Sequence, residues 1–286
     1  MSLAPITLFC YNRPIHLANT LNSLKMNYLS SDSELFVFSD GPKNKADELR
    51  VQEVRNVLRN SSGFNSIKIF ESKVNKGLAK SVIEGVSQIL SEYEKIIVLE
   101  DDLVFVKTFL TFMNNSLDYF EKTDQVNSIS GYKFPIKLPY NFNKDVFFAK
   151  RASSWGWGTW KSRWEKVDWE ISNFSSLEKD KKFKSNFNAG GIDLYRMLKK
   201  QMYGEIDSWA IRWCYDHFVN NAYCVYPTKS LVNNIGTDNS GTHLKNTNKY
   251  NAKLVEDFNP TLEPFFINSS INKRMKYFFS KIFFLK

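Results

Sequence analysis

A short apolar run followed by three acidic residues constrains this chain more than any other stretch. Residues 96–99 read Ile-Ile-Val-Leu, and Glu100, Asp101 and Asp102 follow directly. Four aliphatic residues in a row are typical of a strand buried on both faces, as in parallel sheets covered by helices. In open α/β sheets, ligands bind beyond the carboxyl ends of the strands. The acidic cluster therefore marks the sheet edge where we expect a functional site.

The three adjacent carboxylates repel one another, so we expect a cation to compensate them. Mg2+ and Mn2+ prefer oxygen ligands and bind through one or two carboxylates together with substrate phosphates. In an extended chain Glu100 and Asp102 point to one side and Asp101 to the other, so the three residues cannot share one role. A solvated acidic loop after a strand is the alternative, and the cluster alone does not decide between them.

The composition is that of a globular protein that favours anionic partners. The chain has 286 residues, of which 15% are aromatic, and a formal net charge of +9. A basic balance favours nucleic acid, acidic lipid or phosphorylated substrates. The lysines and arginines match no nucleic-acid-binding motif, so we expect no nucleic-acid partner. Three cysteines without CxxC spacing and the lack of a signal peptide favour a reducing, cytoplasmic setting.

Apolar segments alternate between strand and helix over the first hundred residues. We expect strands at 6–10, 35–38, 67–70 and 96–99, with helices between them whose apolar residues recur at helical spacing. This alternation predicts an α/β fold with a mostly parallel sheet flanked by helices. Neither GxGxxG after the first strand nor GxxxxGK[ST] occurs, which argues against a dinucleotide-binding or P-loop protein.

Two later stretches have unusual compositions. Residues 153–160 read Ser-Ser-Trp-Gly-Trp-Gly-Thr-Trp. Exposed indoles beside a cleft stack on sugar rings or bases, and we favour this interpretation over a packed loop that buries its tryptophans. Residues 271–286 mix aromatic residues with lysine and arginine. They predict an amphipathic helix on an anionic lipid surface, with a helix docked on the domain as the alternative.

Six short motifs, each weak alone, occur in a specific order. They are 10–14 (Cys-Tyr-Asn-Arg-Pro), 39–41 (Ser-Asp-Gly), 75–80 (Asn-Lys-Gly-Leu-Ala-Lys), 100–102 (Glu-Asp-Asp), 154–158 (Ser-Trp-Gly-Trp-Gly) and 207–209 (Asp-Ser-Trp). This set resembles the GT-A fold nucleotide-sugar glycosyltransferases, notably bacterial family 2 enzymes. The acidic motif and the later elements are also similar to eukaryotic N-acetylglucosaminyltransferase I. The resemblance spans nearly the whole chain up to the basic tail.

The resemblance implies that residues 100–102 are the DXD-type motif of that family. Asp102 would be the direct ligand of Mn2+ or Mg2+, Asp101 would face the ribose, and Glu100 would support the site. A cation that bridges the diphosphate neutralises charge on the leaving nucleoside diphosphate. Many family members have Asp-x-Asp at this position, so the Glu-Asp-Asp sequence leaves the role of Glu100 uncertain.

Further donor contacts follow from the same resemblance. Base and ribose would lie at the end of the first strand and at Asp40. A carboxylate can accept a hydrogen bond from a uracil imide, which favours UDP, and the alternative for Asp40 is an Asp-Gly turn without a ligand. Lys76 and Lys80 would lie near the same pocket, unless they are solvated on a helix surface. The first-strand residues implied in donor binding are Tyr11, Asn12 and Arg13.

Asp207 matches the position of the family's catalytic base. An inverting displacement needs a carboxylate within hydrogen-bond reach of the acceptor hydroxyl, whereas the alternative role for Asp207 is a helix N-cap. The resemblance implies acceptor contacts at Trp155, Gly156 and Trp157. His243 lies in a stretch that resembles a late loop over the diphosphate, where it would touch metal or phosphate.

The sequence thus predicts an inverting, metal-dependent glycosyltransferase. It would move a sugar from a nucleotide donor, favoured as a UDP-sugar, to a glycan or lipid-linked saccharide in bacterial surface polysaccharide synthesis. Residues 1–106 would bind the donor, 107–265 would form the acceptor-binding and catalytic half of the same GT-A domain, and 266–286 would be a basic tail. The tail would place the protein peripherally at the inner face of the membrane.

Two other functions stay open at this point. A sugar-nucleotide nucleotidyltransferase would also use an α/β sheet with acidic metal ligands, but the N-terminal region has no glycine- and arginine-rich phosphate loop. A non-catalytic carbohydrate-binding module would use the tryptophan-rich stretch without any metal-dependent affinity for nucleotide.

Overall fold

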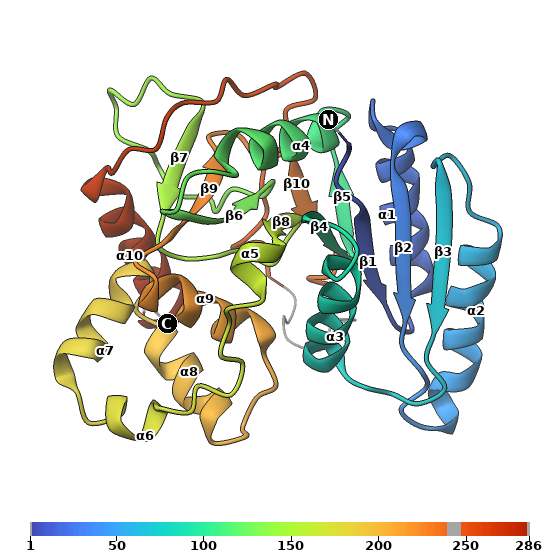
Figure 1. Cartoon of the computed structure of the whole chain (residues 1–286), viewed down its shortest axis with the longest axis horizontal. Helices are drawn as coiled ribbons and strands as arrows, with labels where there is room; N and C mark the ends of the chain where they lie inside the picture. Colours follow the sequence, from blue (N-terminus) through green and yellow to red (C-terminus); the bar gives the residue numbers. More distant parts are fainter. Residues whose placement is uncertain (1, 239–246, 285–286) are drawn as a thin grey trace.

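The centre of the molecule is an eight-stranded mixed sheet with helices on both faces (Figure 1). The computed structural model describes residues 2–238 and 247–284. The strand order is β3-β2-β1-β4-β8-β6-β9-β7, with four parallel and three antiparallel junctions. This arrangement confirms the predicted α/β class and its mostly parallel sheet. The strands are β1 Ile6–Cys10, β2 Glu34–Ser39, β3 Ser66–Glu71, β4 Lys95–Glu100, β6 Val126–Ser130, β7 Val146–Ala149, β8 Trp157–Trp160 and β9 Tyr223–Pro227.

The apolar run of β4 is buried on both faces, as its sequence predicts. Ile97 and Leu99 belong to the core cluster that contains residues of the first two helices, whereas Ile96 and Val98 pack in a second cluster with residues of the third. Alternate side chains of a strand point to opposite faces, so an unbroken aliphatic run is needed when both faces are covered. These helices are α1 Pro14–Lys25, α2 Glu48–Arg59 and α3 Leu78–Leu90.

The order of the central strands creates a switch point beside β1. This strand pairs in parallel with β2 on one side and with β4 on the other. The chain therefore builds outward from β1 to β3 and then returns to the opposite side of β1. Crevices at such points lie outside the carboxyl ends of the strands. Because Phe9 is level with Glu100, the loops that follow β1 and β4 start at the same height.

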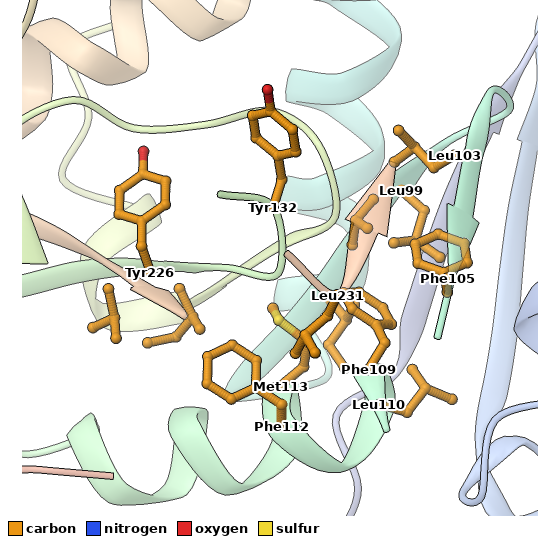
Figure 2. Packing of buried hydrophobic residues seen from close by; sticks show 14 of the residues in the cluster. Leu99, Leu103, Phe105, Phe109, Leu110, Phe112, Met113, Tyr132, Tyr226 and Leu231 are labelled. Atoms are coloured by element: carbon orange, nitrogen blue, oxygen red, sulfur yellow. The ribbon is translucent and has the colours of Figure 1, made fainter. Parts of the chain in front are cut away.

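The second half of the chain completes the sheet and adds a helical layer. β5, Leu103–Phe105, pairs antiparallel with β10, Val232–Asn234, in a separate two-stranded sheet. The rings of Phe105 and Phe109 lie 4.6 Å apart in the core that also contains Leu99 (Figure 2). The other α-helices before the C-terminal segment are α4 Phe109–Phe120, α5 Lys161–Trp164, α6 Phe174–Leu177, α7 Lys181–Phe187, α8 Leu194–Met202 and α9 Trp209–Val219, and the 3-10 helices are η1 Ser30–Asp32, η2 Lys45–Asp47 and η3 Asn188–Gly190.

The C-terminal helix α10, Ser269–Phe284, is docked on the domain through its apolar face. Ile271, Met275 and Phe279 are buried. The guanidinium carbon of Arg151 lies 3.7 Å from the ring centroid of Phe279. The docked-helix alternative therefore describes this face, because Ile271, Met275 and Phe279 contact protein. Within the described ranges, no helix is long and apolar enough to cross a membrane.

Replacing Phe279 with alanine should test this docking. Truncating a buried phenylalanine costs about 3–5 kcal/mol of unfolding free energy, because contacts are lost and a cavity remains. Tyr277→Ala on the outer face of the same helix is the matched control, since Tyr277 is 60% exposed. It should change the unfolding free energy by less than about 0.5 kcal/mol. Denaturant titration measures both variants, and equal effects would contradict a docked helix.

Candidate functional site

An arginine links the ends of β1 and β4 at the switch point. Pro14 begins α1, which leaves residues 11–13 as a short loop between strand and helix. The Arg13 guanidinium contacts the carboxylate of Asp101 and lies 2.9 Å from Oδ2 of Asp102. The backbone N–H of Tyr11 also donates to Asp101, at 3.3 Å. Arg13 is thus the cation that the isolated acidic motif required.

A segment far along the chain closes over Asp102. Asn234, the last residue of β10, donates through Nδ2 to Oδ1 of Asp102 at 3.0 Å. The carbonyl of Asp102 accepts a hydrogen bond from the backbone N–H of Ile235 at 2.8 Å. A Cβ at Gly236 would lie 2.1 Å from Oδ2 of Asp102, so only glycine lets the backbone approach this closely. Sequence reasoning missed Asn234 and Gly236.

The acidic motif keeps surplus negative charge despite Arg13. Burial, reinforced by the charge of Asp102, raises the pKa of Glu100 to about 8. Burial raises the pKa of Asp101 to about 6, although the charge of Arg13 acts in the opposite direction. Burial lowers the pKa of Arg13, but the two aspartates outweigh this effect and raise it above its ordinary value. Glu100 is therefore mostly protonated at neutral pH, and one guanidinium faces the carboxylates of Asp101 and Asp102, which leaves surplus negative charge that favours a further cation.

The carboxylate oxygens of this site could bind a hard cation only together with further ligands, such as substrate phosphates. Among residues 2–238 and 247–284, no group of three or more His, Cys, Asp or Glu residues could hold a metal ion. Each oxygen of Asp102 has one hydrogen-bond donor, from Arg13 or Asn234, and an ionised carboxylate has about four acceptor positions. Nη1 of Arg13 is buried and has no hydrogen-bond partner among the described residues. Asp102 can thus supply a metal ligand and Arg13 a free donor to an anionic ligand.

Asp40 holds the loop that leads into α3. Its carboxylate accepts hydrogen bonds from the backbone N–H groups of Gly41, Lys76 and Gly77 and from the side chain of Asn75, at 2.9–3.1 Å. A carboxylate that accepts this many hydrogen bonds stabilises a turn, which matches the alternative considered for the Asp-Gly sequence. The structure thus places Asp40 under the loop rather than with free oxygens toward a base.

The other predicted donor-binding side chains contact protein groups around this edge. The hydroxyl of Tyr11 donates to Oδ2 of Asp47 at 2.8 Å, and Nδ2 of Asn12 donates to Oδ1 of the same carboxylate at 2.9 Å. The Nζ atoms of the lysines at 76 and 80 lie 2.7 and 3.7 Å from the carboxylate of Glu84. Lys80 is therefore on the exposed surface of α3, and Lys76 is exposed in the loop before it, as the solvated alternative describes.

Asp207 presents an exposed carboxylate next to the same loop. The N-cap of α9 is Ser208, whose hydroxyl accepts a hydrogen bond from the N–H of Ile211, so Asp207 does not have the capping role. The side chain of Asp207 is 64% exposed, and Arg212 lies 3.5 Å away. Oδ2 of Asp207 would be 3.7 Å from a Cβ at Gly77. Asp40 and Asp207 therefore flank one loop.

The tryptophan stretch is mostly core. Trp157 is 0% exposed and stacks on Trp209 with ring centroids 4.9 Å apart. Its indole has no free face for a saccharide, so the packed-loop alternative describes this residue. Gly156 has a φ of 60°, a conformation that glycine adopts readily. Trp155 is half-buried between Tyr132 and Tyr250, at ring-centroid distances of 4.5 and 6.0 Å.

The aromatic packing of Trp157 nevertheless affects the site. Trp209 is the first residue of α9, and it follows Asp207 by two positions. A rigid stack between β8 and α9 therefore fixes where the carboxylate of Asp207 lies. Sequence reasoning assigned Trp155, Gly156 and Trp157 to acceptor contact, whereas the structure buries Trp157 in the core and leaves Trp155 half-buried. His243 lies outside the described residues.

Comparisons with known proteins give only weak similarity. No family model and no curated protein matches the chain. Among solved structures, Staphylococcus aureus TarS is 12% identical with a TM-score of 0.44, over 80% of this chain and 36% of TarS. TarS 1–349 in complex with UDP-GlcNAc is 11% identical with a TM-score of 0.45, over 80% of this chain and 57% of that one.

A third similar structure is a mannosyltransferase. PcManGT from Pyrobaculum calidifontis, in complex with GDP-Man and Mn2+, is 10% identical with a TM-score of 0.42. The similarity covers 76% of this chain and 71% of PcManGT. The chain spans less than two thirds of the length of both TarS structures. Similarity at this level does not assign an activity to this chain.

Changing Asp40 to asparagine should loosen the loop before α3. The amide NH2 cannot accept the N–H groups that now face the carboxylate, and an unsatisfied buried group costs about 1–3 kcal/mol. We expect the amides of Lys76 and Gly77 to exchange hydrogen roughly 10- to 100-fold faster, because local opening becomes easier. Hydrogen-exchange mass spectrometry measures the change.

A matched control for this variant is Asp168→Asn. Asp168 also accepts three backbone N–H groups, those of residues 170–172, but in a different turn. It should speed exchange only in its own turn. Unchanged protection at Lys76 and Gly77 in Asp40→Asn would show that Asp40 does not hold the loop.

Proposed function

We propose that the chain is an inverting, metal-dependent glycosyltransferase that uses a nucleotide-sugar donor. The observation that supports this function most is the convergence of three charged groups at the switch point of the sheet. Arg13 follows β1, Asp101 and Asp102 follow β4, and the guanidinium of Arg13 contacts both carboxylates. This is the sheet edge where α/β proteins bind ligands, and its surplus carboxylates suit a diphosphate bridged by a cation.

The proposed donor site uses each group differently. Asp102 would hold Mn2+ or Mg2+ through its carboxylate, and this cation would neutralise the diphosphate as it leaves. Arg13 has one buried nitrogen without a partner, Nη1, which can donate to a phosphate oxygen. Asp101, which is held by Arg13 and by the N–H of Tyr11, is the proposed ribose contact. We favour UDP as the nucleotide.

Asp207 is the proposed catalytic base. Its exposed carboxylate would accept the proton of the acceptor hydroxyl while that oxygen forms a bond to the anomeric carbon of the donor sugar. The bond from the anomeric carbon to the diphosphate breaks in the same displacement, which inverts the anomeric configuration. The loop held by Asp40 and the Trp157–Trp209 stack would keep this carboxylate in place.

The proposed acceptor is a saccharide, either a glycan or a lipid-linked saccharide. A hexose or N-acetylhexosamine would be added during synthesis of bacterial surface polysaccharide, with the protein peripheral to the inner face of the membrane. Trp155 stays a candidate acceptor contact, because it is half-buried beside Gly156.

Two aspartate variants should separate donor binding from catalysis. Asp102→Asn removes the proposed metal ligand, so it should abolish both transfer and Mn2+-dependent binding of UDP. Asp207→Asn should leave UDP binding unchanged but lower transfer by about 100- to 10,000-fold, the range for loss of a general base. Isothermal titration with UDP and Mn2+, together with a transfer assay, measures both effects.

The matched control is Glu205→Gln, which removes another exposed carboxylate two residues before Asp207. It should retain transfer. Turnover of Asp207→Asn at the wild-type rate would remove this residue as the base. Release of pyrophosphate from a nucleoside triphosphate would instead indicate a nucleotidyltransferase. A UDP affinity that is the same with and without Mn2+ would contradict the proposed metal site.

A further inference from the structure

Two helices at one end of the molecule carry lysines and no acidic residue. α7 contains Lys181, Lys182 and Lys184, and α10 contains Lys273, Lys276 and Lys281. Neither helix includes an aspartate or glutamate within its bounds. The two elements are far apart in the sequence but lie at the same end of the fold (Figure 1).

Three of these lysines, from both helices, share one surface. Lys181 and Lys184 of α7 and Lys276 of α10 line the same open hollow, together with Asn188 of η3. All six lysines are exposed. On α10, the lysines occupy the side opposite Ile271, Met275 and Phe279, which are buried against the domain.

The charge of this surface is not compensated within the chain. In the described ranges, none of the six lysines takes part in an ion pair. The carboxylate next to α7 in sequence, Asp180, accepts a hydrogen bond from the N–H of Lys182 as the helix cap. Lys184 and Lys281 instead have their ammonium groups over the rings of Tyr195 and Tyr277.

Exposed apolar side chains lie among these lysines. Ile267, just before α10, is 62% exposed, and Tyr277 on the outer face of α10 is 60% exposed. Phe283, near the end of the helix, is 41% exposed and stacks on the ring of Phe279. These side chains are not needed for docking, because Ile271, Met275 and Phe279 already bury the inner face of the helix. Aromatic residues next to lysines are typical of the interface between water and lipid headgroups.

We propose that the outer faces of α7 and α10 form a docking surface for an anionic lipid bilayer. The lysines attract the headgroup charge, and Tyr277 contacts the boundary with the acyl chains. The partner surface is thus formed by two helices, one of which the sequence pattern of the tail did not include. This inference extends the peripheral location proposed above, but its test needs no nucleotide sugar, so its failure is distinguishable from failure of the transferase assignment.

Vesicle sedimentation with the full chain tests the proposal. The wild type should bind vesicles of phosphatidylcholine and phosphatidylglycerol and should not bind pure phosphatidylcholine. Replacing Lys181, Lys184 and Lys276 with glutamine should lower the partition coefficient about 100-fold, because each lysine near an anionic surface contributes about 1 kcal/mol. Binding should also fall when the salt is raised to about 1 M, where the screening length is about 3 Å.

The matched control replaces three exposed lysines away from α7 and α10, Lys25, Lys107 and Lys122, with glutamine. It changes the net charge equally and should retain binding. Equal loss in both triple variants would overturn the proposal, because net charge alone would then explain attraction. Wild-type binding to heparin but not to anionic vesicles would also overturn it, and would indicate a soluble polyanion as the partner.

Discussion

The contact of Arg13 with Asp101 and Asp102 is the interaction on which the candidate site depends. Buried carboxylates are costly when they lack a compensating charge, and removing the cation from such a group leaves that cost uncompensated. The parallel pairing of β1 with β4 brings the guanidinium and the two acids to the same level of the sheet. The central sheet and the site are thus one structure, because a shift in the register of β4 would separate the charges.

The position of Asp207 is supported by parts of the chain outside the acidic motif at residues 100–102. Asp40 holds the loop before α3, and the stack of Trp157 on Trp209 fixes the start of α9. Asp207 lies between these two supports. A base that must meet a substrate hydroxyl within hydrogen-bond distance needs such rigid positioning, and loops alone provide it poorly. Trp157 therefore contributes to the proposed chemistry through packing.

Local pattern predicted much of the first half of the chain. The aliphatic run of β4 required burial on both faces, and the acids after it required a cation at the sheet edge. Asn234 and Gly236 could not be found in this way, because they reach Asp102 from about 130 residues along the chain. Burial of Trp157 depends on partners in α9, which the Trp-Gly pattern does not specify. An amphipathic helix has the same pattern whether lipid or protein covers its apolar face. Only the structure shows that protein covers this face of α10.

A crystal grown with UDP and Mn2+ offers the most direct measurement of the central claim. Anomalous scattering at the manganese absorption edge locates the ion independently of the refined protein. We expect one peak between the diphosphate and the carboxylate of Asp102, with the guanidinium of Arg13 beside a phosphate oxygen. UDP bound at another part of the sheet, or a manganese peak away from Asp102 while UDP is present, would contradict the account.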